Sequence, residues 1–173
     1  MKTMIFRESE ARYHQSGGRL RPTLGSVCLG RPYGAAEVDA ATAKRAERIT
    51  VTRLDKADLL DRVAGALAKG HVLAVYQGES EFGPRALCHR SILADPTFKR
   101  MRDVLNARVK LRESFRPFAP VVPLESANDV FELRVASPYM ILVAPVREAF
   151  QDVLPAITHK DGTGRVQTCT AEL

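Results

Sequence analysis

Apolar residues recur along this chain at both helical and strand spacing. The clearest helix begins after Asp55, which can cap it, and ends at Gly70. Residues 71–76 follow as a short apolar run, HVLAVY, which predicts a buried strand. A capped helix, a glycine and a buried strand in this order indicate an α/β domain. The apolar positions of that helix are Leu59, Leu60, Val63, Ala66 and Leu67.

The same patterns predict further elements on both sides of this unit. Asp95 followed by Pro96 favours a helix start, because proline suits the first helical position. The apolar stripe expected on that helix comprises Phe98, Met101, Leu105 and Val109. Other expected helices cover residues 37–48 and 125–131, and expected strands cover residues 27–29, 118–122, 139–146 and 165–170.

Length and composition fit one domain with a packed core. The chain has 173 residues, of which 45% are hydrophobic. We expect a mixed twisted sheet with flanking helices over residues 27–173, after an irregular arm at residues 1–26. No apolar run approaches the roughly 20 residues that cross a bilayer, so no membrane contact is expected. Three widely spaced cysteines, Cys28, Cys88 and Cys169, predict reduced thiols in a cytoplasmic protein rather than disulfides or a zinc site.

Positive charge is concentrated in one part of the sequence. The whole chain has 26 basic and 20 acidic residues. Residues 83–116 contain nine basic and three acidic residues, so this fifth of the chain carries a net charge equal to that of the whole, +6. Such a concentration predicts an anion-binding region, although charge alone does not choose between nucleic acid, phosphorylated metabolites and acidic surfaces.

Two basic segments in this region are candidates for phosphate contacts. In residues 78–91, Gly83-Pro84 fixes a turn before Arg85, and Arg90 and Ser91 follow. In KLRESFRPF, extended backbone would place Lys110, Arg112 and Arg116 on one face, an arrangement that suits a nucleotide triphosphate. A surface loop and an edge strand with solvated charges are the alternative interpretations.

Other polar groups give weaker signals. His159 and Asp161 belong to a polar turn before the last expected strand, where Asp161-Gly162 indicates a turn whatever the function. Glu79 and Glu81 are a possible magnesium pair, although a solvated acidic pair is the simpler interpretation. No cysteine pair has the spacing of a metal site, and we expect no protein metal centre.

Four motifs, in this order and spacing, resemble one family. They are EFGPRAL-x-x-RSILADP, LN-x-x-VK-x-RE-x-FRPFAP, SP-Y-M and H-x-DGT-x-R-V-Q, within residues 29–170. They are similar to the O-carbamoyltransferases of nodulation-factor and antibiotic biosynthesis, the NodU and cephalosporin-carbamoylating type. The resemblance lies in the C-terminal half of that family, which implies a YrdC-like α/β domain.

The resemblance implies a reaction and a division of labour. In this family the YrdC-like half takes ATP, with Mg²⁺, and carbamoyl phosphate to make a carbamoyl adenylate. A separate actin-like half with bound iron then transfers the carbamoyl group to a hydroxyl. That half is expected as a partner chain, so no iron site is expected here. Displacing phosphate and pyrophosphate needs charge neutralisation and alignment, which basic side chains supply.

The motif positions imply roles for individual residues. Lys110 and Arg116 would hold the phosphates of both substrates as catalytic residues, with further cationic contacts from Arg85 and Arg165. Further matched positions, taken as substrate- and nucleotide-binding, are Arg90, Ser91, Arg112, His159 and Asp161.

The chain departs from the family pattern in three ways. It contains no counterpart of the N-terminal half, and it ends before the family's N-T-S-F-N segment, so we expect an incomplete domain. The family's Gly-Asn after Arg-Ala-Leu is Cys88-His89 here. If that glycine has positive φ, a cysteine costs roughly 1 kcal/mol.

These departures leave three functional interpretations open. The first is an enzyme domain that makes carbamoyl adenylate. The second is a non-catalytic remnant or binding module whose basic surface binds nucleotide, RNA or a protein partner. The third is a fragment with an open sheet edge, which would self-associate.

Overall fold

The computed structural model describes residues 26–170. The irregular arm expected at residues 1–26 therefore lies almost wholly outside the described residues, as do residues 171–173. The helical elements and strands, in chain order, are α2 (Ala35–Ala43), α3 (Lys56–Ala68), β1 (Leu73–Tyr76), β2 (Arg90–Leu93), α4 (Met101–Val104), η1 (Leu105–Lys110), β3 (Val121–Pro123), η2 (Leu124–Ser126), α5 (Ala127–Val130), β4 (Leu142–Pro145), α6 (Glu148–Gln151) and β5 (Thr163–Cys169).

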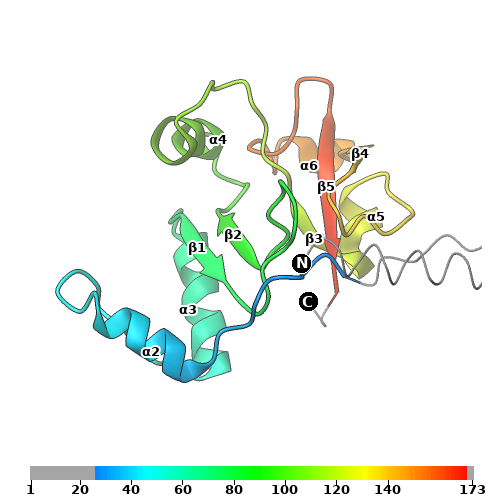
Figure 1. Cartoon of the computed structure of the whole chain (residues 1–173). Helices are drawn as coiled ribbons and strands as arrows, with labels where there is room; N and C mark the ends of the chain where they lie inside the picture. The colour runs from blue at the N-terminus through cyan, green and yellow to red at the C-terminus, as the bar shows by residue number, and fades with distance from the viewer. Residues whose placement is uncertain (1–25, 171–173) are drawn as a thin grey trace, which may run out of the picture.

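The strands form two small sheets, one antiparallel and one of mixed orientation (Figure 1). β1 pairs with β2 antiparallel, with Leu73 opposite Leu93. In the second sheet the order is β3-β5-β4, with β5 parallel to β3 and antiparallel to β4. The mixed α/β fold with flanking helices that the sequence predicts is confirmed.

The last strand, β5, presents alternate side chains to the core and to a second, polar face. On the core side Gly164, Val166 and Thr168 are buried, with Val166 completely so, and on the other side Gln167 is also buried, at 2% exposure. Because side chains alternate across a strand, Arg165 and Gln167 point to the opposite face. The buried side packs in a cluster of Val122, Ala127, Phe131, Leu133, Ala144, Val146, Ile157 and Val166.

A smaller core joins the first sheet to the rest of the chain. Met101 and Leu105, from the predicted apolar stripe, pack with Ala156 in this cluster. Phe98 and Val109, from the same stripe, remain 40% and 38% exposed, so the stripe is buried only at its centre.

The helix after Asp55 is confirmed in position. Asp55 accepts a hydrogen bond from the backbone N–H of Asp58, and Gly70 takes a φ of +81° just after the helix end. However, no residue of α3 is buried, and Leu59 and Leu60 are 49% and 58% exposed. The strand predicted at 71–76 is present as β1, but it is only half-buried, so the prediction of its burial is wrong.

Two predicted element starts are also wrong, each for a local reason. The Asp95 carboxylate accepts hydrogen bonds from the backbone N–H and hydroxyl of Thr97, which closes a turn, and the helix begins only at Met101. The strand expected from Phe118 begins at Val121, after Pro120, which has no N–H to donate to a ladder.

Candidate functional site

The two sheets and the loops between them enclose a pocket of about 270 Å³ that we call the cationic pocket. It receives residues from β2, from the end of η1 and the loop after it, and from β5. No aspartate or glutamate is among the described residues that line it. Its polar and charged lining residues are Arg85, Cys88, Ser91, Lys110, Arg112, Arg165 and Gln167.

The cations of this pocket lie close enough to repel one another. Partial burial lowers the pKa of Arg165, and the positive charges of Arg85 and Arg112 lower it further. Within the described residues, Arg85, Lys110 and Arg165 form no ion pair with a carboxylate. Such a group of unneutralised cations favours a multiply charged anionic ligand.

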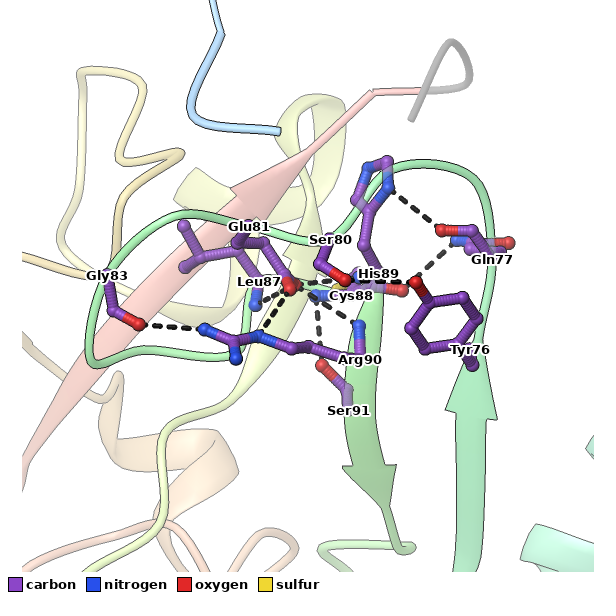
Figure 2. Close-up of polar contacts among 10 residues, drawn as sticks. All are labelled: Tyr76, Gln77, Ser80, Glu81, Gly83, Leu87, Cys88, His89, Arg90 and Ser91. Carbon is purple, nitrogen blue, oxygen red and sulfur yellow. Dashed lines mark hydrogen bonds and ion pairs between the residues drawn. The ribbon is translucent and has the colours of Figure 1, made fainter. Parts of the chain in front are cut away.

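One wall of the pocket is a loop closed by the buried carboxylate of Glu81 (Figure 2). Its side chain is 0% exposed. It accepts hydrogen bonds from the backbone N–H groups of Leu87, His89 (2.8 Å) and Arg90 (3.3 Å). Burial alone would raise the pKa of Glu81, but these hydrogen bonds outweigh burial and hold it below its ordinary value. The interpretation of Glu81 as part of a solvated acidic pair is therefore wrong.

The opposite wall is held by a buried amide, that of Asn106 in η1. Asn106 is 1% exposed, and its Nδ2 donates to the carbonyl oxygens of Ser114 (3.2 Å) and Arg116 (2.9 Å). Its Oδ1 accepts from Nε of Arg112 at 2.7 Å. Arg112 also donates to the carbonyl of Pro117 and lies 4.6 Å from the centre of the Phe118 ring. Arg112 is therefore fixed from several sides before any ligand binds.

Backbone strain is concentrated around the cationic pocket. Among the described residues, the non-glycine positions with positive φ are Cys88 (77°), Leu111 (48°) and Met140 (54°). Cys88 and Met140 line the pocket, and Leu111 lies between two residues that do. Such strain persists where the surrounding structure fixes it and is commonest at functional sites. Cys88 thus meets the condition set out above, a cysteine at positive φ where the family has glycine.

Cys88 lines the pocket as a neutral thiol. Burial raises its pKa to about 11, and the nearby charges of Cys169 and Glu81 act in the same direction. At neutral pH it therefore adds no negative charge to the anion site. All three cysteines are free.

The structure brings together some of the residues that the sequence singled out and separates others. Arg85, Ser91, Lys110, Arg112 and Arg165 share the cationic pocket. Arg90 instead lies within the Glu81 loop, where Nε contacts Glu81 at 3.1 Å and Nη2 donates to the carbonyl of Gly83 at 2.7 Å. The side chains outside the pocket lining are those of Arg90, Arg116, His159 and Asp161.

The remaining separated residues have local partners. Arg116 is 54% exposed and lies 3.8 Å from Glu113. The Asp161 carboxylate accepts hydrogen bonds from the hydroxyl and N–H of Thr163, which lower its pKa and close the turn before β5. The backbone N–H of His159 donates to the Thr163 carbonyl of the same turn.

The predicted shared extended face of Lys110, Arg112 and Arg116 is wrong. Lys110 ends the π-helix η1, and Leu111 then takes a left-handed conformation that turns the chain. The amide of Asn106 imposes this turn by bonding to the carbonyls of residues 114 and 116. Lys110 and Arg112 consequently reach the pocket from a helix end rather than from a strand.

Sequence reasoning missed the roles of four residues that build the pocket. Glu81 and Asn106 are buried polar residues that hold its walls, whereas Gln167 and Met140 line it. The alternation in the last strand places Gln167 on the same face as Arg165, and this signal was available. Asn106 lies directly beside Leu105 of the apolar stripe, a position where a buried polar side chain needs hydrogen-bond partners.

Comparison with known proteins assigns the fold and the pocket to a family. The family model for the C-terminus of carbamoyltransferases matches residues 64–173, which include every residue of the pocket lining. The chain belongs to the carbamoyltransferase C-terminal family. The resemblance expected from the four motifs is thus confirmed.

Several relatives have been named. The chain is 49% identical over 128 residues to nodulation protein NolNO of Sinorhizobium fredii, covering 72% of this chain and 18% of that protein. It is 43% identical over 141 residues to 3'-hydroxymethylcephem-O-carbamoyltransferase of Amycolatopsis lactamdurans, covering 78% of this chain and 26% of the relative. Nodulation protein NolO of Bradyrhizobium diazoefficiens is 52% identical over 114 residues, 64% of this chain and 21% of the relative. The chain therefore spans between about a fifth and a quarter of the length of these curated relatives.

No helix in residues 26–170 combines the length and hydropathy needed to cross a membrane. The same residues contain no group of three or more histidine, cysteine, aspartate or glutamate side chains placed to hold a metal ion.

Proposed function

We propose that this carbamoyltransferase-family domain binds ATP and carbamoyl phosphate in the cationic pocket and forms a carbamoyl adenylate. The observation that carries the proposal is the convergence of Arg85, Lys110, Arg112 and Arg165 on one pocket without a lining carboxylate. The sulfur of Cys88 and the hydroxyl of Ser91 complete a wall that is polar but carries no negative charge at neutral pH.

The chemistry demands such a pocket. ATP, carbamoyl phosphate and water would give carbamoyl adenylate, phosphate and pyrophosphate, so two anionic groups leave during the reaction. Bringing two anions together and stabilising their departure requires fixed positive charge in a site that excludes most water. Arg112, held by Asn106 and stacked on Phe118, needs little reorganisation to do this. Mg²⁺ would enter with the nucleotide phosphates.

The test is pyrophosphate exchange into ATP that depends on carbamoyl phosphate. We expect exchange with the wild-type chain and a loss on the order of 100-fold in Lys110→Ala and in Arg165→Gln, because each removes one donor to the developing charge. Lys99→Ala is the matched control, since Lys99 is exposed and does not line the pocket. Folded wild-type protein that binds neither ATP nor carbamoyl phosphate in calorimetry would refute the proposal.

Arg116 belongs to the proposal through its motif position, although its side chain lies outside the pocket lining. It follows the turn that Asn106 fixes, close in sequence to Arg112. If ligand draws Arg116 to the pocket, Arg116→Ala will weaken ATP binding as Lys110→Ala does. Wild-type affinity in Arg116→Ala would remove this residue from the site.

A non-catalytic binding module is the second candidate, because the same unneutralised cations would also hold an anion without turning it over. The chain spans 18% to 26% of the named relatives, and acceptor transfer is proposed to need a separate actin-like partner chain. This candidate predicts tight binding of nucleotide or RNA with no pyrophosphate exchange. RNA binding would show a steep salt dependence and no competition by ATP.

A further inference from the structure

We propose that Glu81 is a positioning residue for the cationic pocket, which acts by holding the loop of residues 82–90 so that Arg85 faces the bound anion. This inference rests on the proposed function, since it assumes that the pocket binds an anionic substrate. Glu81 itself does not line the pocket and would not touch that substrate.

The loop is held by hydrogen bonds far more than by packing. Leu87 is the one buried residue within it, at 8% exposure. Phe82, Gly83, Pro84 and Ala86 are all exposed. A loop with so little apolar burial has few contacts to fix it against solvent, so the polar contacts determine its shape.

Those polar contacts converge on the Glu81 carboxylate from the far end of the loop. Oε1 accepts from the N–H groups of Leu87, His89 and Arg90, and Oε2 accepts from Nε of Arg90. A carboxylate can accept about four hydrogen bonds, so a single side chain ties the start of the loop to its end. Bonds to a charged acceptor are stronger than bonds between neutral groups.

Arg90 extends this hydrogen-bond network to the residues just before Arg85. Its Nη2 donates to the carbonyl of Gly83 at 2.7 Å, and Gly83 has a φ of +135° that side chains rarely adopt. Pro84 then fixes the backbone immediately ahead of Arg85. Figure 2 shows Arg90 reaching across the loop from Glu81 to Gly83.

The pocket side of the loop is anchored separately. The backbone N–H of Cys88 donates to Oγ of Ser91 at 2.9 Å, and Nε2 of Gln77 donates to the carbonyl of Cys88 at 3.1 Å. Cys88 and Ser91 both line the pocket. Arg85 therefore lies between two fixed parts of the loop. Glu81 and Arg90 fix the part away from the pocket.

Electrostatics gives a reason for a carboxylate at this position. Arg85 and Arg165 repel each other across the pocket, and Arg85 has no carboxylate partner among the described residues. An unconstrained loop would relax by moving Arg85 towards solvent. The buried charge of Glu81 prevents this by fixing the loop while leaving Arg85 itself unpaired and free for a ligand.

The experiment is a double-mutant cycle between Glu81→Gln and Arg85→Gln. Calorimetric titration with inorganic pyrophosphate measures the affinity of each variant. Because glutamine retains one acceptor oxygen but loses the charge, we expect Glu81→Gln alone to weaken pyrophosphate binding about tenfold. In the Arg85→Gln background the same change should have almost no effect on the affinity, because the loop then carries no guanidinium to place beside the anion.

A purely structural role predicts a different result. Glu81→Gln would then lower the affinity by the same factor in both backgrounds, and this outcome would overturn the inference. Unchanged affinity in Glu81→Gln would also overturn it. Glu79→Gln is the matched control, because Glu79 is exposed two residues away and should leave binding unchanged.

Amide hydrogen exchange tests whether Glu81 holds the loop, independently of ligand binding. The amides of Leu87, His89 and Arg90 donate to Glu81, so they should exchange faster in Glu81→Gln than in the wild type, with no pyrophosphate present. If wild-type protein binds neither pyrophosphate nor ATP, the proposed function fails. Amide hydrogen exchange then still tests whether Glu81 holds the loop. Equal exchange in both proteins would refute the holding role itself.

A second variant keeps the test valid if Glu81→Gln does not fold. Arg90→Gln removes the guanidinium contacts to Gly83 and to Oε2 of Glu81, and it leaves the three backbone bonds to Glu81 in place. The Arg90 side chain is 43% exposed, so its replacement leaves the core intact. Weaker binding that disappears in the Arg85→Gln background would support the inference, and additive losses would count against it.

Discussion

At the scale of single residues, the wall of the cationic pocket includes a side chain in an unfavourable backbone conformation. Cys88 has a φ of 77°, in the region where a Cβ clashes with the neighbouring backbone. Hydrogen bonds fix this conformation, since the N–H and carbonyl of Cys88 are both engaged. The conformation therefore belongs to the loop and does not depend on the thiol.

Replacing this cysteine by glycine should stabilise the protein. We expect Cys88→Gly to raise the free energy of unfolding by up to about 1 kcal/mol, because relief of the strain outweighs the greater freedom of glycine in the unfolded chain. Denaturant unfolding measures the change. Cys28→Gly is the control, since Cys28 does not have positive φ, and it should destabilise the protein. A loss of stability in Cys88→Gly would show that the strain costs little.

At the scale of elements, η1 shows how one buried amide organises a whole segment. Asn106 lies in a π-helix, a rare structure that often marks functional sites. Its side chain makes three hydrogen bonds, and its own carbonyl accepts the N–H of Arg112 at 3.0 Å. The loop of residues 111–117 has few other attachments, because Arg112 is its one residue that is not exposed.

Removing this amide should release the loop. We expect Asn106→Ala to lower the free energy of unfolding by about 2–4 kcal/mol, since it creates a cavity and leaves buried groups without partners. Pyrophosphate affinity should fall as well, because Arg112 loses its support. Asn128→Ala is the control: Asn128 is exposed, and its replacement should cost less than about 0.5 kcal/mol. Equal losses in the two variants would contradict the role of Asn106.

At the scale of the whole molecule, the pocket exists only in the folded chain. Its cations come from residues 85, 110, 112 and 165, which two sheets and a helix end bring together. The unfolded chain has no such site, so a ligand of the pocket must stabilise the folded state.

This linkage gives a simple prediction. Pyrophosphate at 100 times its dissociation constant should raise the free energy of unfolding by about 2.7 kcal/mol, seen as a higher melting temperature. The same concentration should have little effect on Arg165→Gln, which lacks one of the cations that line the pocket. An equal rise in both proteins would place pyrophosphate elsewhere on the surface.

Local patterns in the sequence were enough to predict much of the chain. The cap at Asp55, the glycine after α3 and the alternation of β5 depend on neighbouring residues, and all three are present. The motifs likewise identified the family and five of the residues that line the pocket. These features follow from backbone preferences and side-chain spacing, which act over a few residues.

Long-range contacts, by contrast, decided which polar groups face a ligand. The sequence placed both Arg85 and Arg90 among the residues expected to bind substrate, yet the buried Glu81 binds Arg90 and leaves Arg85 unpaired within the described chain. It also favoured an extended Lys110–Arg116 segment, whereas the Asn106 amide turns that segment back on η1. A buried polar group must find hydrogen-bond partners, and only the tertiary structure determines which partners are near enough.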